Sequence, residues 1–152
     1  NVVALLKDNP TSRRILWEGW NVGTIGGAPL PPCHKTYQFF VTSDGRLSSW
    51  LHLRSSDVFL GLPFNVCGLA LVTHLLAEQC GYEVHEAVVY ACDAHLYRNH
   101  TQQAREQLTR APRALPQLKV HRKPDSLFGY TIDDLELVNY DPHPPIKAPV
   151  AV

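Results

Sequence analysis

Hydrophobic and polar positions follow three patterns in the middle of the chain. Apolar and polar residues alternate on both sides of Ser43–Gly45, which predicts two strands joined by a hairpin, because Asp-Gly is a strong turn signal. Val66–Gly81 is apolar nearly all round, which predicts a long central helix that ends at the glycine. Glu83–Tyr97 is rich in valine, alanine and aromatic residues, which predicts a buried strand.

Shorter patterns at both ends of the chain predict smaller elements around this centre. They are the end of a helix at Val2–Leu6, a short strand or turn at 13–20, a Gly- and Pro-rich loop at 22–32, a loop or short helix at 57–65, an amphipathic surface helix at 99–112, strands at 117–124 and 127–142, and an extended tail at 143–152. Together these elements predict an α+β fold, in which one mostly β layer packs against a long buried helix.

Composition narrows the class of protein. The 152 residues are 45% apolar and 18% charged, which is typical of a single globular domain with a substantial core. The 14 basic residues equal the 14 acidic ones, which argues against a nucleic-acid binder, since that class needs a basic surplus. No apolar run approaches the roughly twenty residues of a membrane span. Val2–Leu6 is too short for a signal peptide, so we expect a cytoplasmic protein without a membrane partner.

One of the four cysteines is a candidate nucleophile. Cys33 lies in the segment PPCH, at the start of a predicted strand, whereas the cysteine spacing matches neither a zinc motif nor a dense disulfide framework. A buried structural cysteine is the alternative. A thiolate is the reactive form, so a nucleophile needs a nearby cation. His34 should point to the opposite face of the strand, which leaves Arg13, Arg14 and Arg54 as candidates.

A second cluster spans Leu53–Asn65. Arg54, Ser55 and Ser56 combine a guanidinium group with two hydroxyls, which suits a phosphate ligand. The apolar segment Leu60–Phe64 that follows would make a wall for an aromatic ligand. An exposed polar loop without a ligand is the alternative.

A third cluster spans Asp93–His100. His95 and Tyr97 share one face of a strand and can both donate to a sugar hydroxyl or a base. A histidine and a tyrosine satisfied within the core are the alternative. The spacing of His95 and His100 fits no metal motif, so we expect no metal. His143 stands between prolines and is interpreted as part of a stiff tail.

Read together, four segments resemble the thymidylate synthase family. They are PPCH, RSSDVFLGLPFN, DAHLYRNH and the terminal YDPHPPIKAPVAV, in the order typical of the family. The resemblance extends from Ser12 to Val152. It implies a thymidylate synthase-like fold, a homodimer formed through a sheet face, and a catalytic domain over residues 1–152 that lacks the N-terminal region of the family.

The resemblance also implies a reaction and a role for each motif residue. Cys33 would add to C6 of dUMP, and 5,10-methylenetetrahydrofolate would supply one carbon and a hydride to give dTMP. The implied nucleotide ligands are Arg54, Ser55, Ser56, Asp57, His95 and Tyr97, with Arg13 and Arg14 reaching in from the partner subunit. The implied folate contacts are Asp57, Leu60, Gly61, Phe64 and Ala151, with the Val152 carboxylate closing a C-terminal lid.

Asn65 is expected to read the base. An asparagine amide can meet both the N3–H donor and the O4 acceptor of uracil, whereas aspartate would suit cytosine better. Leaving one of these buried groups unpaired costs ~1–3 kcal/mol, which corresponds to a roughly 5- to 150-fold preference.

Several positions depart from the usual family pattern. They are His52, Leu53, Cys67 and the pair Ala91-Cys92. The departures leave two alternatives open. One is a pyrimidine nucleotide hydroxymethylase of the same superfamily, in which His52 could position a water molecule, and the other is a catalytically incomplete fragment that only binds nucleotide.

Overall fold

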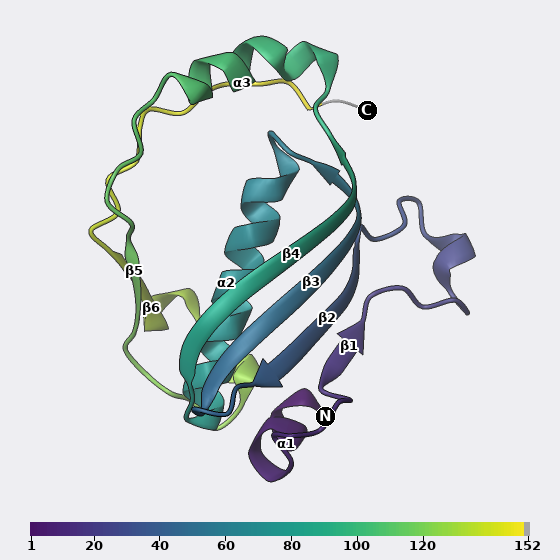
Figure 1. The fold of residues 1–152 in the computed structure, drawn as a ribbon, viewed down its shortest axis with the longest axis vertical. Coiled ribbons are helices and arrows are strands. Elements are labelled where there is room, and N and C mark those ends of the chain that lie inside the picture. The colour runs from purple at the N-terminus through teal and green to yellow at the C-terminus, as the bar shows by residue number, and fades with distance from the viewer. Residues whose placement is uncertain (151–152) are drawn as a thin grey trace.

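A computed structural model describes residues 1–150 and contains a four-stranded mixed sheet with a long helix against one face (Figure 1). The strands lie in the order β1 (Leu16–Glu18), β2 (His34–Val41), β3 (Arg46–Asp57), β4 (Glu83–His95). The pairs β1–β2 and β2–β3 are antiparallel, and β4 runs parallel to β3. Helix α2 (Gly61–Cys80) makes the crossover that a parallel pair requires. The predicted α+β class is therefore confirmed.

The β2–β3 hairpin forms where the sequence predicts it. Gly45 adopts a φ of 80°, which a side chain would disfavour, and its N–H donates to the Thr42 carbonyl at 3.0 Å. The Thr42 N–H in turn donates to the Arg46 carbonyl at 2.8 Å. This turn sets the register from Val41 opposite Leu47 to Thr36 opposite His52, and an irregularity between Thr36 and His34 then brings His34 opposite Leu53.

Helix α2 is longer at its start than the apolar pattern predicts. It begins at Gly61 rather than Val66, because Asp57 Oδ1 accepts the N–H groups of Phe59 and Leu60 at 3.0 and 3.3 Å and stabilises the entry. Pro63 is tolerated because it falls in the first turn, where the amide has no helical partner. The predicted end is confirmed, since Gly81 takes a left-handed φ of 81° after the last helical residue.

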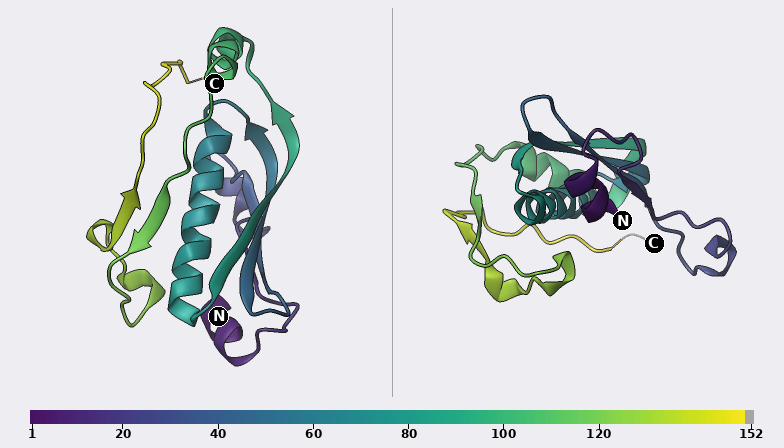
Figure 2. Two further views of the ribbon diagram at one scale, coloured as in Figure 1. Left: turned by 60° about the vertical axis from the view of Figure 1, so that its left-hand side comes forward. Right: turned by 90° about the horizontal axis from the view of Figure 1, so that it is seen from below.

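Two hydrophobic clusters fill the space between the sheet and α2, and Figure 2 shows the helix between the sheet and the β5–β6 ribbon. Their buried members are Leu6, Ile15, Phe39, Leu47, Leu76 and Ala77 in one, and Leu51, Leu53 and Leu69 in the other. Strand β4 contributes partly buried side chains, namely Val84, Val89 and Ala91. The prediction of a buried strand at this position was wrong, because β4 is an edge strand whose other face is exposed among the described residues.

The remaining elements surround this framework. They are α1 (Val2–Asp8), α3 (Thr101–Leu108), the paired strands β5 (Gln117–Val120) and β6 (Leu135–Val138), and short 3-10 helices η1 (Ile25–Gly27), η2 (Arg98–His100), η3 (Leu127–Gly129) and η4 (Ile132–Asp134). The C-terminal segment runs back along α3 (Figure 1). It is tied there by hydrogen bonds from His143 to the Ala111 carbonyl at 2.8 Å and from His100 to the Pro149 carbonyl at 2.7 Å.

Helix α2 is long and apolar enough to cross a bilayer, as judged by length and composition only. The prediction that no apolar run approaches this length was therefore wrong. The core helix of a water-soluble protein meets the same criteria, and a single such helix is weak evidence for a membrane span.

Asp134 anchors the segment between β5 and β6. Its carboxylate accepts hydrogen bonds from Arg122 at 2.6 and 2.7 Å and from the Thr131 amide at 2.8 Å, and these contacts lower the pKa of Asp134 to about 2. The charged form is thus favoured in the folded state. The resulting stability is complete above the unfolded pKa near 3.8 and is lost as pH falls towards 2.

We therefore expect Asp134→Asn to lower the melting temperature at neutral pH and to flatten the loss of stability between about pH 4 and pH 2. Asp133→Asn is the matched control, because Asp133 is exposed on the same short helix. Thermal unfolding across this pH range checks the prediction. Equal acid sensitivity of the wild type and the Asp134 variant would contradict it.

Candidate active site

Four elements bring the sequence motifs to one edge of the sheet. Cys33 immediately precedes β2, and β3 and β4 end side by side, with Ser55 opposite Asp93 and Asp57 opposite His95. The N-terminal part of α2 carries Asn65 to the same edge, where its side chain contacts His34. Polar groups from motifs far apart in sequence therefore converge here, as binding sites in mixed sheets commonly do.

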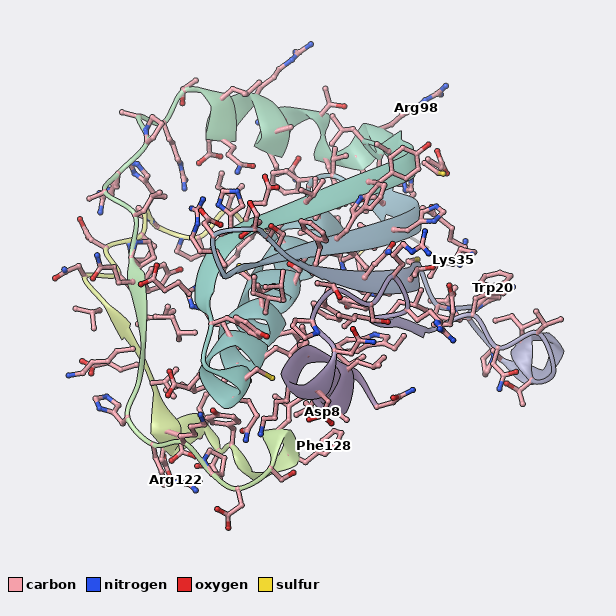
Figure 3. All side chains as sticks on the ribbon, turned by 60° about the horizontal axis from the view of Figure 1, so that its bottom comes forward. Asp8, Trp20, Lys35, Arg98, Arg122 and Phe128 are labelled. Carbon is pink, nitrogen blue, oxygen red and sulfur yellow. The ribbon has the colours of Figure 1, made fainter. Side chains whose placement is uncertain are left out.

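Arg54 holds the segment that carries the thiol. Its Nε and one terminal nitrogen donate to the carbonyls of Pro32 and Pro31 at 3.0 and 2.6 Å, and its backbone N–H donates to the Cys33 carbonyl at 2.9 Å. The guanidinium also lies 5.7 Å from the centre of the Trp20 ring, and Figure 3 shows Trp20 on the protruding loop. Cys33 is half-buried, so part of this residue remains accessible, as a nucleophile requires.

We expect Arg54→Ala to release residues 29–33, because it removes two charge-assisted hydrogen bonds of ~1.5–3 kcal/mol each. Arg54→Lys should retain part of the order, since lysine keeps the charge but not the planar fork. Amide hydrogen exchange of this segment measures the effect. Unchanged exchange in the alanine variant would show that Arg54 does not position Cys33.

His34 and Asn65 form the second contact of the site. Asn65 Nδ2 lies 3.0 Å from His34 Nε2, and burial lowers the pKa of His34, which favours a neutral imidazole. A neutral Nε2 can accept the hydrogen from the amide. The amide orientation of Asn65 is thereby fixed, with Oδ1 as the acceptor of the same side chain. His34 was not predicted as a site residue, because it was expected to point away from Cys33.

The third cluster is ordered around Asp93. The rings of His95 and Tyr97 pack edge to face with centres 4.9 Å apart, as two side chains predicted to share a face should. Asp93 Oδ2 lies 3.6 Å from His95 Nδ1 and accepts a hydrogen bond from Ser55 at 3.3 Å. Asp93 and Trp20 were missed as site residues, because their roles depend on contacts across strands and loops.

Other predicted residues take different positions. Ser56 is only 2% exposed, which does not support it as a direct ligand contact. Asp57 uses Oδ1 to hold the turn that leads into α2, where it accepts the N–H groups of Phe59 and Leu60. Leu60 and Phe64 line a hollow of about 610 Å³ beside Tyr140 and His143, and Phe64 is 79% exposed. Gly61 begins α2, and Ala151 and Val152 lie outside the described residues.

Arg13 and Arg14 do not reach the site within this chain. Both are exposed and precede β1, whose Leu16 lies opposite Gln38, several residues along β2 from Cys33. Among residues 1–150, no group of three or more histidine, cysteine or acidic side chains could hold a metal ion.

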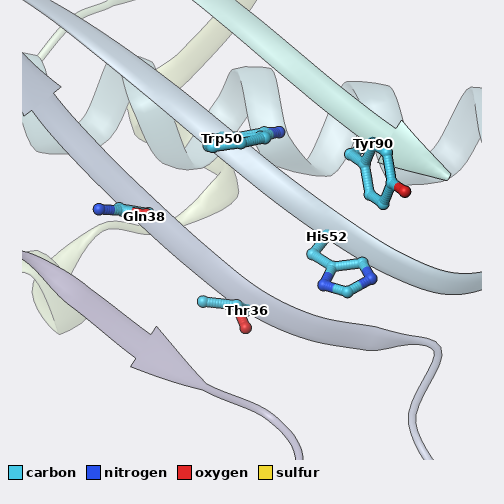
Figure 4. A pocket seen from close by; sticks show the side chains of 5 residues that line it. All are labelled: Thr36, Gln38, Trp50, His52 and Tyr90. Atoms are coloured by element: carbon cyan, nitrogen blue, oxygen red, sulfur yellow. The ribbon is translucent and has the colours of Figure 1, made fainter. Parts of the chain in front are cut away.

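The unusual residues separate onto two faces of the sheet. Leu53 is fully buried in the core, where Ala91 packs against the same cluster. His52 and Cys92 lie on the outer face, with Nε2 and Sγ 3.4 Å apart. Figure 4 shows His52 beside Trp50 and Tyr90, with α2 behind the sheet. His52 therefore faces away from Asn65, which argues against a role in positioning water at the site.

A half-buried cysteine, whose backbone an arginine holds and whose neighbouring histidine contacts a fixed amide, defines a site suited to covalent attack on an anionic ligand that forms hydrogen bonds. Comparison with known proteins agrees. The family model described as thymidylate synthase matches residues 1–152. The chain is 52% identical over 151 residues to a curated thymidylate synthase of Zymomonas mobilis, covering 99% of this chain and 51% of that protein. The chain thus belongs to the thymidylate synthase family and spans about half the length of this curated relative.

Proposed function

We propose that the chain is the nucleotide-binding, thiol-bearing part of an enzyme that methylates dUMP to dTMP. The observation that carries the proposal is the joint placement of Cys33, Arg54 and Asn65 at one edge of the sheet. Family membership supports it, since 52% identity extends over nearly the whole chain. The substrate would be dUMP and the co-substrate 5,10-methylenetetrahydrofolate, which supplies one carbon and a hydride.

In the proposed mechanism, the Cys33 thiolate attacks C6 of the uracil ring and makes C5 nucleophilic. Arg54 has further N–H donors beyond the two that hold the proline carbonyls, and these would bind the 5′-phosphate together with Ser55. Asn65 would read N3 and O4 of the base. His95 and Tyr97 would bind the 3′-hydroxyl of the sugar, and Asp57, Leu60, Gly61, Phe64 and Ala151 would contact the folate.

We further propose a cytoplasmic homodimer formed through the outer face of the sheet. Exposed aromatic residues gather there: Trp50 and Tyr90 lie on this face (Figure 4), and Phe40 lines a hollow together with Trp50. Phe40, Trp50 and Tyr90 are exposed by 62%, 50% and 53%. An isologous interface can bury such a face against its own copy. Arg13 and Arg14, remote from their own site, would then serve the partner's phosphate.

The test supplies 5-tritiated dUMP and 5,10-methylenetetrahydrofolate to the chain, alone and together with a complementary polypeptide. We define the complementary polypeptide as the part of the Zymomonas mobilis protein outside the matched segment, about half of its length. Tritium release reports attack at C5, and product mass distinguishes a methyl from a hydroxymethyl group. A hydroxymethyl product, or no tritium release in either preparation, would overturn the proposal.

A further inference from the structure

The outer side of helix α2 is apolar but uncovered. Among its 20 residues, Glu78 is the only aspartate, glutamate, lysine or arginine, yet only 22% of its apolar 18-residue window is buried. The buried side faces the sheet through residues such as Leu69 and Leu76. A helix that is apolar all round is normally enclosed by protein on every side. The exposed side of α2 therefore indicates a docking surface.

A groove runs along this side between α2 and the β5–β6 ribbon. Cys67, Leu71 and His74 form a stripe at helical spacing on one wall, and Leu118, Ile132 and Leu137 line the other. The groove encloses about 530 Å³, and Leu71, Ile132 and Leu137 are exposed by 37%, 81% and 54%. This shape and composition suit a convex apolar element such as an amphipathic helix.

The shape of the groove decides between possible occupants. A second copy of the chain would present the same hollow, and two hollows cannot fill each other. A bilayer would have to reach α2 past the β5–β6 ribbon, whose facing wall carries Glu136. A polypeptide of complementary shape meets neither obstacle.

The Zymomonas mobilis relative contains a polypeptide segment of suitable size to occupy the groove. The matched segment accounts for only 51% of the Zymomonas mobilis relative, so nearly as many residues of the family fold lie outside it. We propose that the α2 groove docks that other half of the fold, through a convex apolar element. The docking does not rest on the catalytic proposal, because association is measured without activity.

The test is co-purification of the chain, carrying an affinity tag, with the complementary polypeptide expressed in the same cells. We expect a 1:1 complex by size-exclusion chromatography with light scattering. Leu71→Glu and Ile132→Glu, on opposite walls of the groove, should each lower the captured fraction at least about tenfold, because a carboxylate would be buried without a partner. Leu108→Glu is the matched control, since Leu108 is 86% exposed at the end of α3, away from the groove.

Circular dichroism and thermal unfolding of each variant exclude loss of the fold as the cause, and the exposure of Ile132 makes that variant the safer of the two. Absence of a complex with the wild-type chain would overturn the proposal, as would a complex that survives both groove substitutions. Self-association that only the groove variants abolish would assign the groove to a second copy. Sedimentation with anionic phospholipid vesicles, lost only in those variants, would assign it to a membrane. Either result would also overturn the proposal.

Discussion

Cys33→Ser is expected to abolish tritium release from 5-tritiated dUMP, with a fall of at least about 10³-fold, the size typical of removing a nucleophile. A serine hydroxyl is almost entirely protonated at neutral pH, so it cannot replace a thiolate that adds to C6. The hydrogen bond from the Arg54 amide to the carbonyl of residue 33 involves only the backbone and should persist. Nucleotide binding should therefore change little, as measured by calorimetric titration with dUMP.

Cys80→Ser is the matched control for this experiment. Cys80 is also half-buried, but it lies at the far end of α2, with Sγ 4.0 Å from the Val3 carbonyl. It should keep both tritium release and dUMP binding. Substantial release by the Cys33 variant would remove this residue from the nucleophile role.

Asn65→Asp is expected to move the preference from dUMP towards dCMP. The present amide donates to His34 and keeps Oδ1 as an acceptor for the uracil N3–H. A carboxylate cannot donate to O4, and the resulting unpaired group should cost ~1–3 kcal/mol for dUMP. The ratio of dissociation constants for dUMP and dCMP should therefore shift by roughly 5- to 150-fold.

The carboxylate at position 65 would also stand beside His34 and favour its protonated form, opposing the lowered pKa that burial gives it in the present chain. Asn99→Asp makes the same chemical change at an exposed position after β4 and should leave the ratio unchanged. Titrations of both variants with both nucleotides check the prediction. An unaltered ratio in the Asn65 variant would show that this side chain does not read the base.

Local chemistry made part of the fold predictable from the sequence. The turn at Gly45 and the end of α2 at Gly81 both require a positive φ that glycine adopts readily, so a glycine at these positions in the sequence is enough to predict them. The start of α2 was missed because it depends on the turn that Asp57 holds before the helix rather than on the apolar period. The burial of β4 was misjudged because a valine-rich pattern does not reveal whether a second layer covers the strand.

The site divides in the same way. The motifs singled out Cys33, Arg54 and Asn65 as candidates, since each lies in a segment with a characteristic residue pattern, and the structure places the three at one edge of the sheet. The contacts that hold these residues in place join positions more than 20 apart in the sequence, such as Arg54 with Pro31 and Asn65 with His34. Such pairings follow from strand register and helix placement. They could not be derived from the motifs alone.

The order of the strands has a kinetic consequence. Neighbours in the sheet are also successive along the chain, and α2 makes the single crossover between β3 and β4. Each pairing from β1 to β4 therefore closes a modest loop, and the entropy lost in closing a loop grows with its length. The residues from Cys33 to His95 can therefore reach their mutual positions without contacts from α3, β5 or β6.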